Sequence, residues 1–250
     1  MVKPSTLQRS PLSPTLWPPD AFVWHRSLVF LLGLLGAFLA GALLARGVIL
    51  GSGEPAQHGA LTLTWGIATA QIVTYAPLIV LVFTLLPWVA QRSMKDLGLK
   101  PFTLRALGIA VAGAVVMDIV AGAAAGIESL ITHSPTVEEA VSLFTSTKNH
   151  ALLAVFALIA TVAAPFVEEC LFRGFLFNAL LRYMPLWASA VLSGLVFGAI
   201  HASWSAFVPL GCTGIVLAYV YYYSGSLTAS IVTHALFNAL NLLLLANGRT

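Results

Sequence analysis

Long apolar runs constrain this chain more than any other feature. Short polar stretches separate seven such runs, at about 27–50, 61–90, 104–126, 150–182, 186–203, 206–223 and 227–246. A helix needs about 20 apolar residues to cross the hydrocarbon core of a bilayer. Of all residues, 8% are charged, whereas a soluble domain carries about 25%. We therefore expect an all-α fold, a polytopic transmembrane helical bundle with about seven to eight membrane helices.

The first 21 residues differ in composition from the rest of the chain. Prolines stand there among Ser and Thr residues, at Pro4, Pro11, Pro14, Pro18 and Pro19. Such a segment cannot bury enough apolar surface to fold, so we expect a disordered cytoplasmic tail at 1–21. We expect a single transmembrane domain over 22–250, because no other stretch has the composition of a soluble domain.

Basic residues mark one side of the expected bundle. Lys and Arg gather in the tail, in the stretch 92–105 and at Arg182, whereas the stretch 127–149 is acidic. Because cytoplasmic loops carry the excess of Lys and Arg, this pattern predicts a cytoplasmic N-terminus. It also predicts that 127–149 lies outside and, after seven spans, that the C-terminus lies outside. The net charge of +3 is small and spread through loops, which argues against nucleic-acid binding.

One apolar run carries ionisable residues in its middle. Glu168, Glu169 and Arg173 lie within 150–182, where each charge costs about 2.5–3.5 kcal/mol and persists where it is paired, solvated or used in chemistry. On a helix Glu169 and Arg173 are four residues apart and share a face, so we expect them to form an ion pair. Glu168 is rotated by about 100° from Glu169 and has no such local partner.

A hairpin can bring a histidine to the depth of Glu168. Glu168 stands fifteen residues before Tyr183, and His201 stands fifteen residues after Leu186. In an antiparallel hairpin both residues therefore lie about 22 Å from the turn. Phe197 lies one helical turn before His201, on the same face. The sequence thus allows a carboxylate and an imidazole to face each other inside the membrane.

The last run adds a second histidine. His234 and Asn238 are four residues apart and share a face. His234 lies about 12 Å from its turn, which leaves a mismatch of about 10 Å with His201 for helix tilt or a shifted boundary to absorb. A membrane His or Asn taken alone is as readily explained by hydrogen bonding between helices.

Other acidic residues suggest other roles. Asp118 lies inside the run 104–126 and is expected to face the bundle interior as a packing or solvation feature. A carrier in which Asp118, Glu168 and His201 relay protons is an alternative, although the repeated halves common in carriers are not evident. Glu138 and Glu139 lie in a polar stretch and are expected on a solvated face.

The chain carries three spaced motifs in its second half, Glu168-Glu169-xxx-Arg173, Phe197-xxx-His201 and His234-xxx-Asn238. Together they resemble the CAAX protease and bacteriocin-processing family (CPBP, also called Abi), intramembrane endopeptidases that include the type II CAAX prenyl endopeptidases. The resemblance covers about 152–245. It implies a helical bundle with a cytosol-facing cavity and a catalytic core at about 150–246.

The resemblance also implies a role for each motif residue. These roles are the general base that activates water (Glu168), a side chain that holds the water (His201), oxyanion stabilisers (His234, Asn238) and supporting residues (Glu169, Arg173, Phe197). Imidazole and amide N–H groups stabilise developing negative charge best where water is scarce. Glu168, His201 and His234 also match the ligands of zinc, yet no HExxH pair is present. A site without a cofactor and a site with a divalent metal such as zinc therefore both stay open.

These implications define the expected function. We expect an intramembrane endopeptidase that hydrolyses peptide bonds of membrane-associated or lipidated peptides and proteins. A non-catalytic bacteriocin-immunity or scaffold protein of the same fold is the alternative. The expected partners are a membrane-associated peptide or protein substrate and the lipid bilayer, and the expected location is the cytoplasmic membrane of a bacterium.

Overall fold

The computed structural model describes residues 24–53, 62–101, 103–133, 139–201 and 203–248. All regular structure in these ranges is helical. Six helical runs are long and apolar enough to cross a membrane: α1 (Trp24–Gly51), α2 (Trp65–Ala90), α3 (Leu104–Thr132), the run His150–Leu180, α9 (Phe207–Ser224) and α10 (Leu227–Asn247). The expected polytopic helical bundle is confirmed, and the protein is an integral membrane protein. The tail expected at 1–21 lies outside the described residues.

One expected span is shorter than the sequence suggests. The apolar stretch 186–203 forms α8 (Leu186–Ile200), which has 15 residues and is about 22 Å long. The helix closes with a tight turn in which the N–H of His201 donates to the carbonyl oxygen of Gly198 at 3.3 Å. His201 therefore follows directly on a helix that is too short to cross the bilayer by itself.

The stretch 127–149 is more ordered than the expected polar loop. α3 continues to Thr132, and residues Glu139–Thr145 form the short helix α4. Leu143 and Phe144 bury their side chains in one cluster with Leu152 and Phe156. Burial of these two side chains holds α4 in place, although the polar composition around it favours a loop.

The central run His150–Leu180 is a continuous helix with two widened segments. Its parts are α5 (His150–Leu158), η1 (Ile159–Ala163), α6 (Ala164–Glu169), η2 (Cys170–Phe177) and α7 (Asn178–Leu180), of which η1 and η2 are π-helical. Pro165 has no N–H and interrupts the α-helical pattern between η1 and α6. The side-chain amide of Asn178, the first residue of α7, donates to the carbonyl oxygens of Arg173 and Gly174 in η2 at 2.7 and 3.2 Å. Widened turns of this kind are frequent at functional sites.

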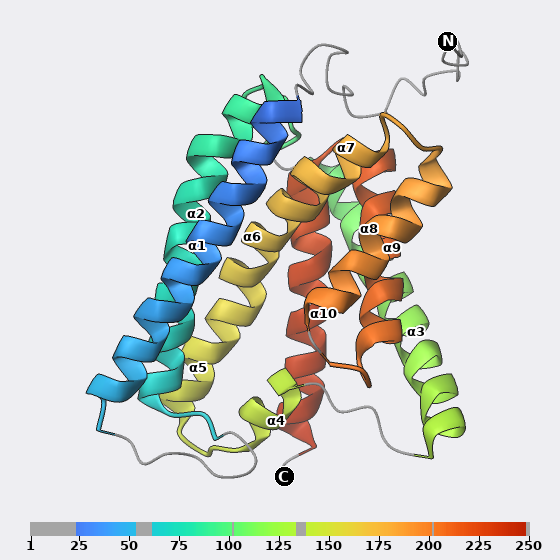
Figure 1. Ribbon diagram of the computed structural model, residues 1–250. Helices are drawn as coiled ribbons and strands as arrows, with labels where there is room; N and C mark the ends of the chain where they lie inside the picture. Colours follow the sequence, from blue (N-terminus) through green and yellow to red (C-terminus); the bar gives the residue numbers. More distant parts are fainter. Residues whose placement is uncertain (1–23, 54–61, 102, 134–138, 202, 249–250) are drawn as a thin grey trace.

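The helices enclose the central run between two groups. Figure 1 shows α1 and α2 as an antiparallel pair on one side, α3, α8 and α9 on the other, and the central run and α10 between them. The C-terminal ends of α2, α7 and α9 lie together at what we call the α7 end. The C-terminal ends of α1, α3 and α10 lie together with α4 at the opposite α4 end.

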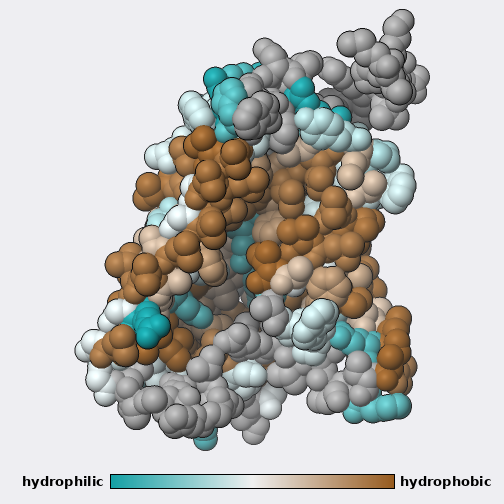
Figure 2. All heavy atoms as spheres, viewed as in Figure 1, coloured by the Kyte–Doolittle hydropathy of each residue, from teal (hydrophilic) through white to brown (hydrophobic). Residues whose placement is uncertain are grey.

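The outside of the bundle is apolar. Figure 2 shows hydrophobic surface over the middle of the molecule and hydrophilic patches near both ends. Large apolar side chains of several helices are exposed, among them Leu43, Ile119 and Leu158. Lipid replaces water around such a belt, as in other helical membrane proteins.

Glycines bring α8 and α9 into close contact. A Cβ atom at Gly194 would lie 2.6 Å from the carbonyl oxygen of Gly211, and one at Gly198 would lie 2.5 Å from that of Phe207. Small residues allow two membrane helices to approach closely. This contact fixes the end of α8 and thereby the position of His201.

Candidate active site

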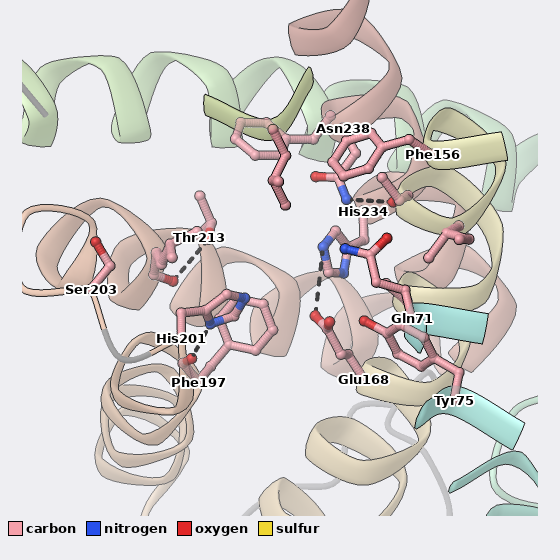
Figure 3. Close-up of a pocket in the computed structure, with 16 residues that line it drawn as sticks. Gln71, Tyr75, Phe156, Glu168, Phe197, His201, Ser203, Thr213, His234 and Asn238 are labelled. Carbon is pink, nitrogen blue, oxygen red and sulfur yellow. Dashed lines mark hydrogen bonds and ion pairs between the residues drawn. The ribbon is translucent and has the colours of Figure 1, made fainter. Parts of the chain in front are cut away.

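A cavity of about 360 Å³ lies inside the bundle. Its walls come from α2, the central run, α8, α9, α10 and α4. Side chains from all three motifs line it, namely Glu168, Phe197, His201, His234 and Asn238. Figure 3 shows these side chains arranged around one space, with the imidazoles of His201 and His234 and the carboxylate of Glu168 turned toward it.

Glu169 lies behind the cavity and is fully buried. Its Oε1 accepts from Nη1 of Arg173 at 2.8 Å, which confirms the expected ion pair. Its Oε2 accepts from the hydroxyl of Ser230 at 2.6 Å. Arg173 is also fully buried and donates from Nη2 to the carbonyl oxygen of Gly214 at 2.7 Å. Buried charges persist when they are paired and hydrogen-bonded in this way.

His234 lies between the two glutamates. Its Nδ1 is 3.1 Å from Oε1 of Glu169, and its Nε2 is 4.0 Å from Oε2 of Glu168. Because a carboxylate oxygen can only accept here, we assign the Nδ1 proton to the hydrogen bond with Glu169. This bond orients the ring and turns Nε2 toward Glu168 and the cavity.

Glu168 differs from its neighbour in having no hydrogen bond to the described residues. Its side chain is 16% exposed and lies in the cavity wall. Among the described residues it forms an ion pair with Nε2 of His234 at 4.0 Å. The carboxylate is therefore partly exposed to the cavity and free to bind a water molecule or a substrate.

His201 is fixed by the end of α8. Its Nδ1 lies 2.8 Å from the carbonyl oxygen of Phe197 and donates to it, which leaves Nε2 without this proton in the neutral ring. The ring of Phe197 lies 5.0 Å from that of His201 and 5.8 Å from that of His234. Phe197 thus separates and supports both imidazoles. The depth mismatch expected between the two histidines does not keep them apart, because both rings contact Phe197, and Figure 1 shows α8 tilted against α10.

Asn238 is held by the first π-helical segment. Its Nδ2 donates to the carbonyl oxygen of Ala160 at 2.7 Å. An amide nitrogen carries two protons, so one N–H group remains for a ligand in the cavity. The widened turn of η1 therefore provides the contact that positions this side chain.

The sequence motifs do not include all polar residues of the cavity. Gln71 and Tyr75 of α2 also line it (Figure 3), and Oε1 of Gln71 is buried with no hydrogen-bond partner. A glutamine inside an apolar run is a signal that sequence reasoning could have used. Asp118 lies on α3 and does not line the cavity, so the structure does not join it to Glu168 and His201 in a relay.

The motif residues do not form a metal-binding group in this arrangement. Within the described ranges, no three His, Cys, Asp or Glu side chains come close enough together to hold a metal ion. The donor set of Glu168, His201 and His234 therefore does not fit a zinc site here, and we derive no chemical step through a metal.

Fold and site together define a class, the polytopic membrane proteins with a carboxylate and imidazoles around a cavity inside the bundle. Residues 150–240 match the family model described as type II CAAX prenyl endopeptidase Rce1-like. This match confirms the resemblance to the CPBP family and supports a peptidase at the level of the family. It covers the central run, α8, α9 and most of α10, and it leaves α1 to α3 unmatched. No curated protein and no solved structure matches the chain.

Proposed function

We propose that the protein is an intramembrane endopeptidase that hydrolyses peptide bonds of membrane-associated or lipidated peptides and proteins. The observation that carries the proposal is the contrast between the two glutamates. Glu169 accepts hydrogen bonds from several side chains, whereas Glu168 accepts none from the described residues. Glu168 lines the cavity together with His201 and His234. A carboxylate in this position suits a general base.

In the proposed reaction Glu168 removes a proton from a water molecule in the cavity. The lone pair on Nε2 of His201 accepts the second hydrogen of this water and orients its oxygen. The water oxygen then forms a bond to the carbonyl carbon of the scissile peptide. Held geometry of this kind lowers the entropic part of the barrier.

Attack on the carbonyl carbon places negative charge on the carbonyl oxygen. The free N–H of Asn238, and Nε2 of His234 when it carries a proton, are the donors available to this oxyanion. Collapse of the intermediate breaks the C–N bond, and Glu168 passes its proton to the leaving amine. Hydrogen-bond donors stabilise an oxyanion more strongly in a water-poor cavity than in water. Removal of one such donor typically lowers kcat by about 100-fold to 1,000-fold.

A cleavage assay with isosteric variants tests the proposal. Purified protein in liposomes is incubated with a panel of membrane-anchored peptides, and products are identified by mass spectrometry. Glu168→Gln keeps the shape of the side chain but cannot accept the proton, so we expect a loss of at least about 100-fold in kcat. His201→Ala should also be strongly impaired. The control is Asp118→Asn, which changes a membrane carboxylate away from the cavity and should cleave like wild type.

The activity of each variant must be interpreted together with a measurement of its folding. Thermal unfolding in detergent shows whether each variant is folded, since a non-catalytic protein of this fold would lose stability in these variants but never show turnover. If Glu168→Gln and His201→Ala cleave as fast as wild type while remaining folded, the proposed mechanism is wrong.

A further inference from the structure

Helix α2 supplies one wall of the cavity and lies outside the matched region. The family model covers 150–240, so it assigns no role to any residue of this helix. α2 packs against the central run, where the rings of Phe83 and Phe166 stack with their centroids 5.5 Å apart. Its polar side chains in the cavity wall are Gln71 and Tyr75. The three sequence motifs leave both of them unexplained.

Gln71 offers a hydrogen-bond acceptor to a ligand in the cavity. Its Oε1 is buried and has no partner among the residues that the structure describes. Figure 3 shows its amide directed into the cavity. A buried acceptor without a partner destabilises a fold, so such an atom calls for a ligand or a water molecule that satisfies it. The N–H group of a bound peptide has the chemistry that this oxygen lacks.

Tyr75 follows Gln71 by one helical turn, on the same face of α2. Its hydroxyl is directed toward the carboxylate of Glu168, with which it interacts electrostatically. It forms no hydrogen bond within the described part of the chain. Because a phenol hydroxyl both donates and accepts, it is available to a peptide group that lies next to Glu168.

The spacing of these two side chains matches that of an extended peptide. From Gln71 to Tyr75 the helix advances by about 6 Å. In an extended chain the backbone groups on one edge recur every two residues, which is about 6.7 Å. A helical peptide offers no such edge, since its interior N–H and C=O groups bond to each other.

We propose that Gln71 and Tyr75 bind the main chain of the substrate and hold it extended along α2. In this arrangement Tyr75 contacts the peptide group beside Glu168, and Gln71 accepts from a backbone N–H about two residues from the scissile bond. Contacts to the main chain tolerate many side-chain sequences, and they require a helical membrane segment to unwind before it is cut. This inference rests on the proposed endopeptidase function.

Ester substitutions in the peptide test the contact with Gln71. An ester linkage replaces one backbone N–H by an oxygen atom and thus removes one donor at a time. A series of fluorescent membrane-anchored peptides carries the ester at one position after another. Their affinities are measured with Glu168→Gln in liposomes, which should bind peptide without cutting it, and thermal unfolding in detergent confirms that each variant is folded.

We expect one position at which the ester weakens binding by about tenfold, the equivalent of one hydrogen bond. Adding Gln71→Leu should weaken binding of the all-amide peptide by the same factor and abolish the effect of the ester. Tyr75→Phe, which removes the hydroxyl alone, should also weaken binding. The control is Thr69→Val, since Thr69 is exposed on α2 and does not line the cavity. An ester effect that persists in Gln71→Leu would overturn the proposed contact.

A second peptide tests the extended conformation. Residues on both sides of the same segment are replaced by α-aminoisobutyric acid, which favours a helix. We expect this peptide to lose most of its binding, because its backbone groups are already paired. Binding as tight as that of the parent peptide would show that the substrate is not held extended along α2.

Cleavage of the same peptides by wild type separates this inference from the proposed function. If wild type cuts the all-amide peptide and no ester effect depends on Gln71, the endopeptidase function stands and the role of α2 fails. If binding depends on Gln71 as expected but no peptide is cut, the role of α2 in peptide binding stands and the endopeptidase function fails. If no peptide is bound or cut, both are contradicted.

Discussion

Glu168 and Glu169 are neighbours in sequence, yet their surroundings give them different tasks. Glu169 is fully buried and accepts from Arg173, Ser230 and His234. Glu168 is partly exposed to the cavity and has His234 at 4.0 Å. One carboxylate therefore holds helices together and orients an imidazole, and the other is available for chemistry.

The first prediction at the residue scale concerns Glu169→Gln. This change keeps the shape of the side chain but removes the charge that balances the buried Arg173. Breaking a buried ion pair from one side costs about 3–5 kcal/mol, so we expect a clear fall of the unfolding temperature in detergent. Glu168→Gln leaves the ion pair intact, so its unfolding temperature should fall much less. Equal stability of both variants would show that the pair does not stabilise the fold.

Gln71 allows a prediction outside the matched region. Its Oε1 is buried without a partner in the cavity wall, so we expect it to accept an N–H group of the substrate. Gln71→Leu should raise KM by about tenfold, the equivalent of one hydrogen bond, with kcat nearly unchanged. The stability of the free protein should not fall, since the change removes an unsatisfied polar atom. An unchanged KM would mean that the side chain does not contact substrate.

At the scale of helices, the site depends on interruptions of regular structure. α8 ends after 15 residues and leaves His201 at the cavity. The widened segment η1 offers the carbonyl oxygen of Ala160 to Asn238. The close contact of α8 with α9 holds the end of α8, and with it His201, in place.

Gly198→Ala tests the contact of α8 with α9. The added Cβ would lie 2.5 Å from the carbonyl oxygen of Phe207 and 2.9 Å from the nitrogen of Gly211, both backbone atoms. Overpacking typically costs about 1–3 kcal/mol, so we expect lower thermal stability, and we expect cleavage to fall further because His201 is displaced. Gly108→Ala on α3 is the matched control, since a Cβ there meets nothing within 4 Å. Unchanged cleavage by Gly198→Ala would show that α8 tolerates a shift.

The sequence predicts some of these elements well and others poorly. Apolar runs locate the long helices to within a few residues, because lipid demands an uninterrupted apolar surface. The spacing of Glu169 and Arg173 predicts their ion pair, because it depends on one helical turn. Helix α4 and the π-helical segment η1 make contacts with distant residues, such as Phe144 with Phe156 and Ala160 with Asn238. Composition and periodicity do not predict such contacts.

At the scale of the whole molecule, charge is distributed unevenly between the two ends. Six basic side chains lie at the α7 end, and Asp96 is the acidic side chain described there, so the formal charge is 6 − 1 = +5. The hydroxyl and the backbone N–H of Ser93 donate to Asp96 and hold the pKa of its carboxyl below the usual value. Asp96 therefore stays ionised near neutral pH, and the positive excess persists.

This asymmetry makes the orientation of the bundle a testable consequence of a few surface charges. Replacing Lys95, Lys100 and Arg105 together by Gln removes half of the six basic side chains at the α7 end. Because an excess of Lys and Arg retains a loop in the cytoplasm, we expect a mixed population. A membrane-impermeant maleimide should then label a cysteine introduced at the α7 end, Tyr183→Cys in a Cys212→Ala background, in spheroplasts as well as in inverted vesicles. Lys148→Gln removes a basic side chain from the α4 end and should leave the orientation uniform. A uniform orientation in the triple variant would mean that the apolar helices, and not the loop charges, set the orientation of the bundle.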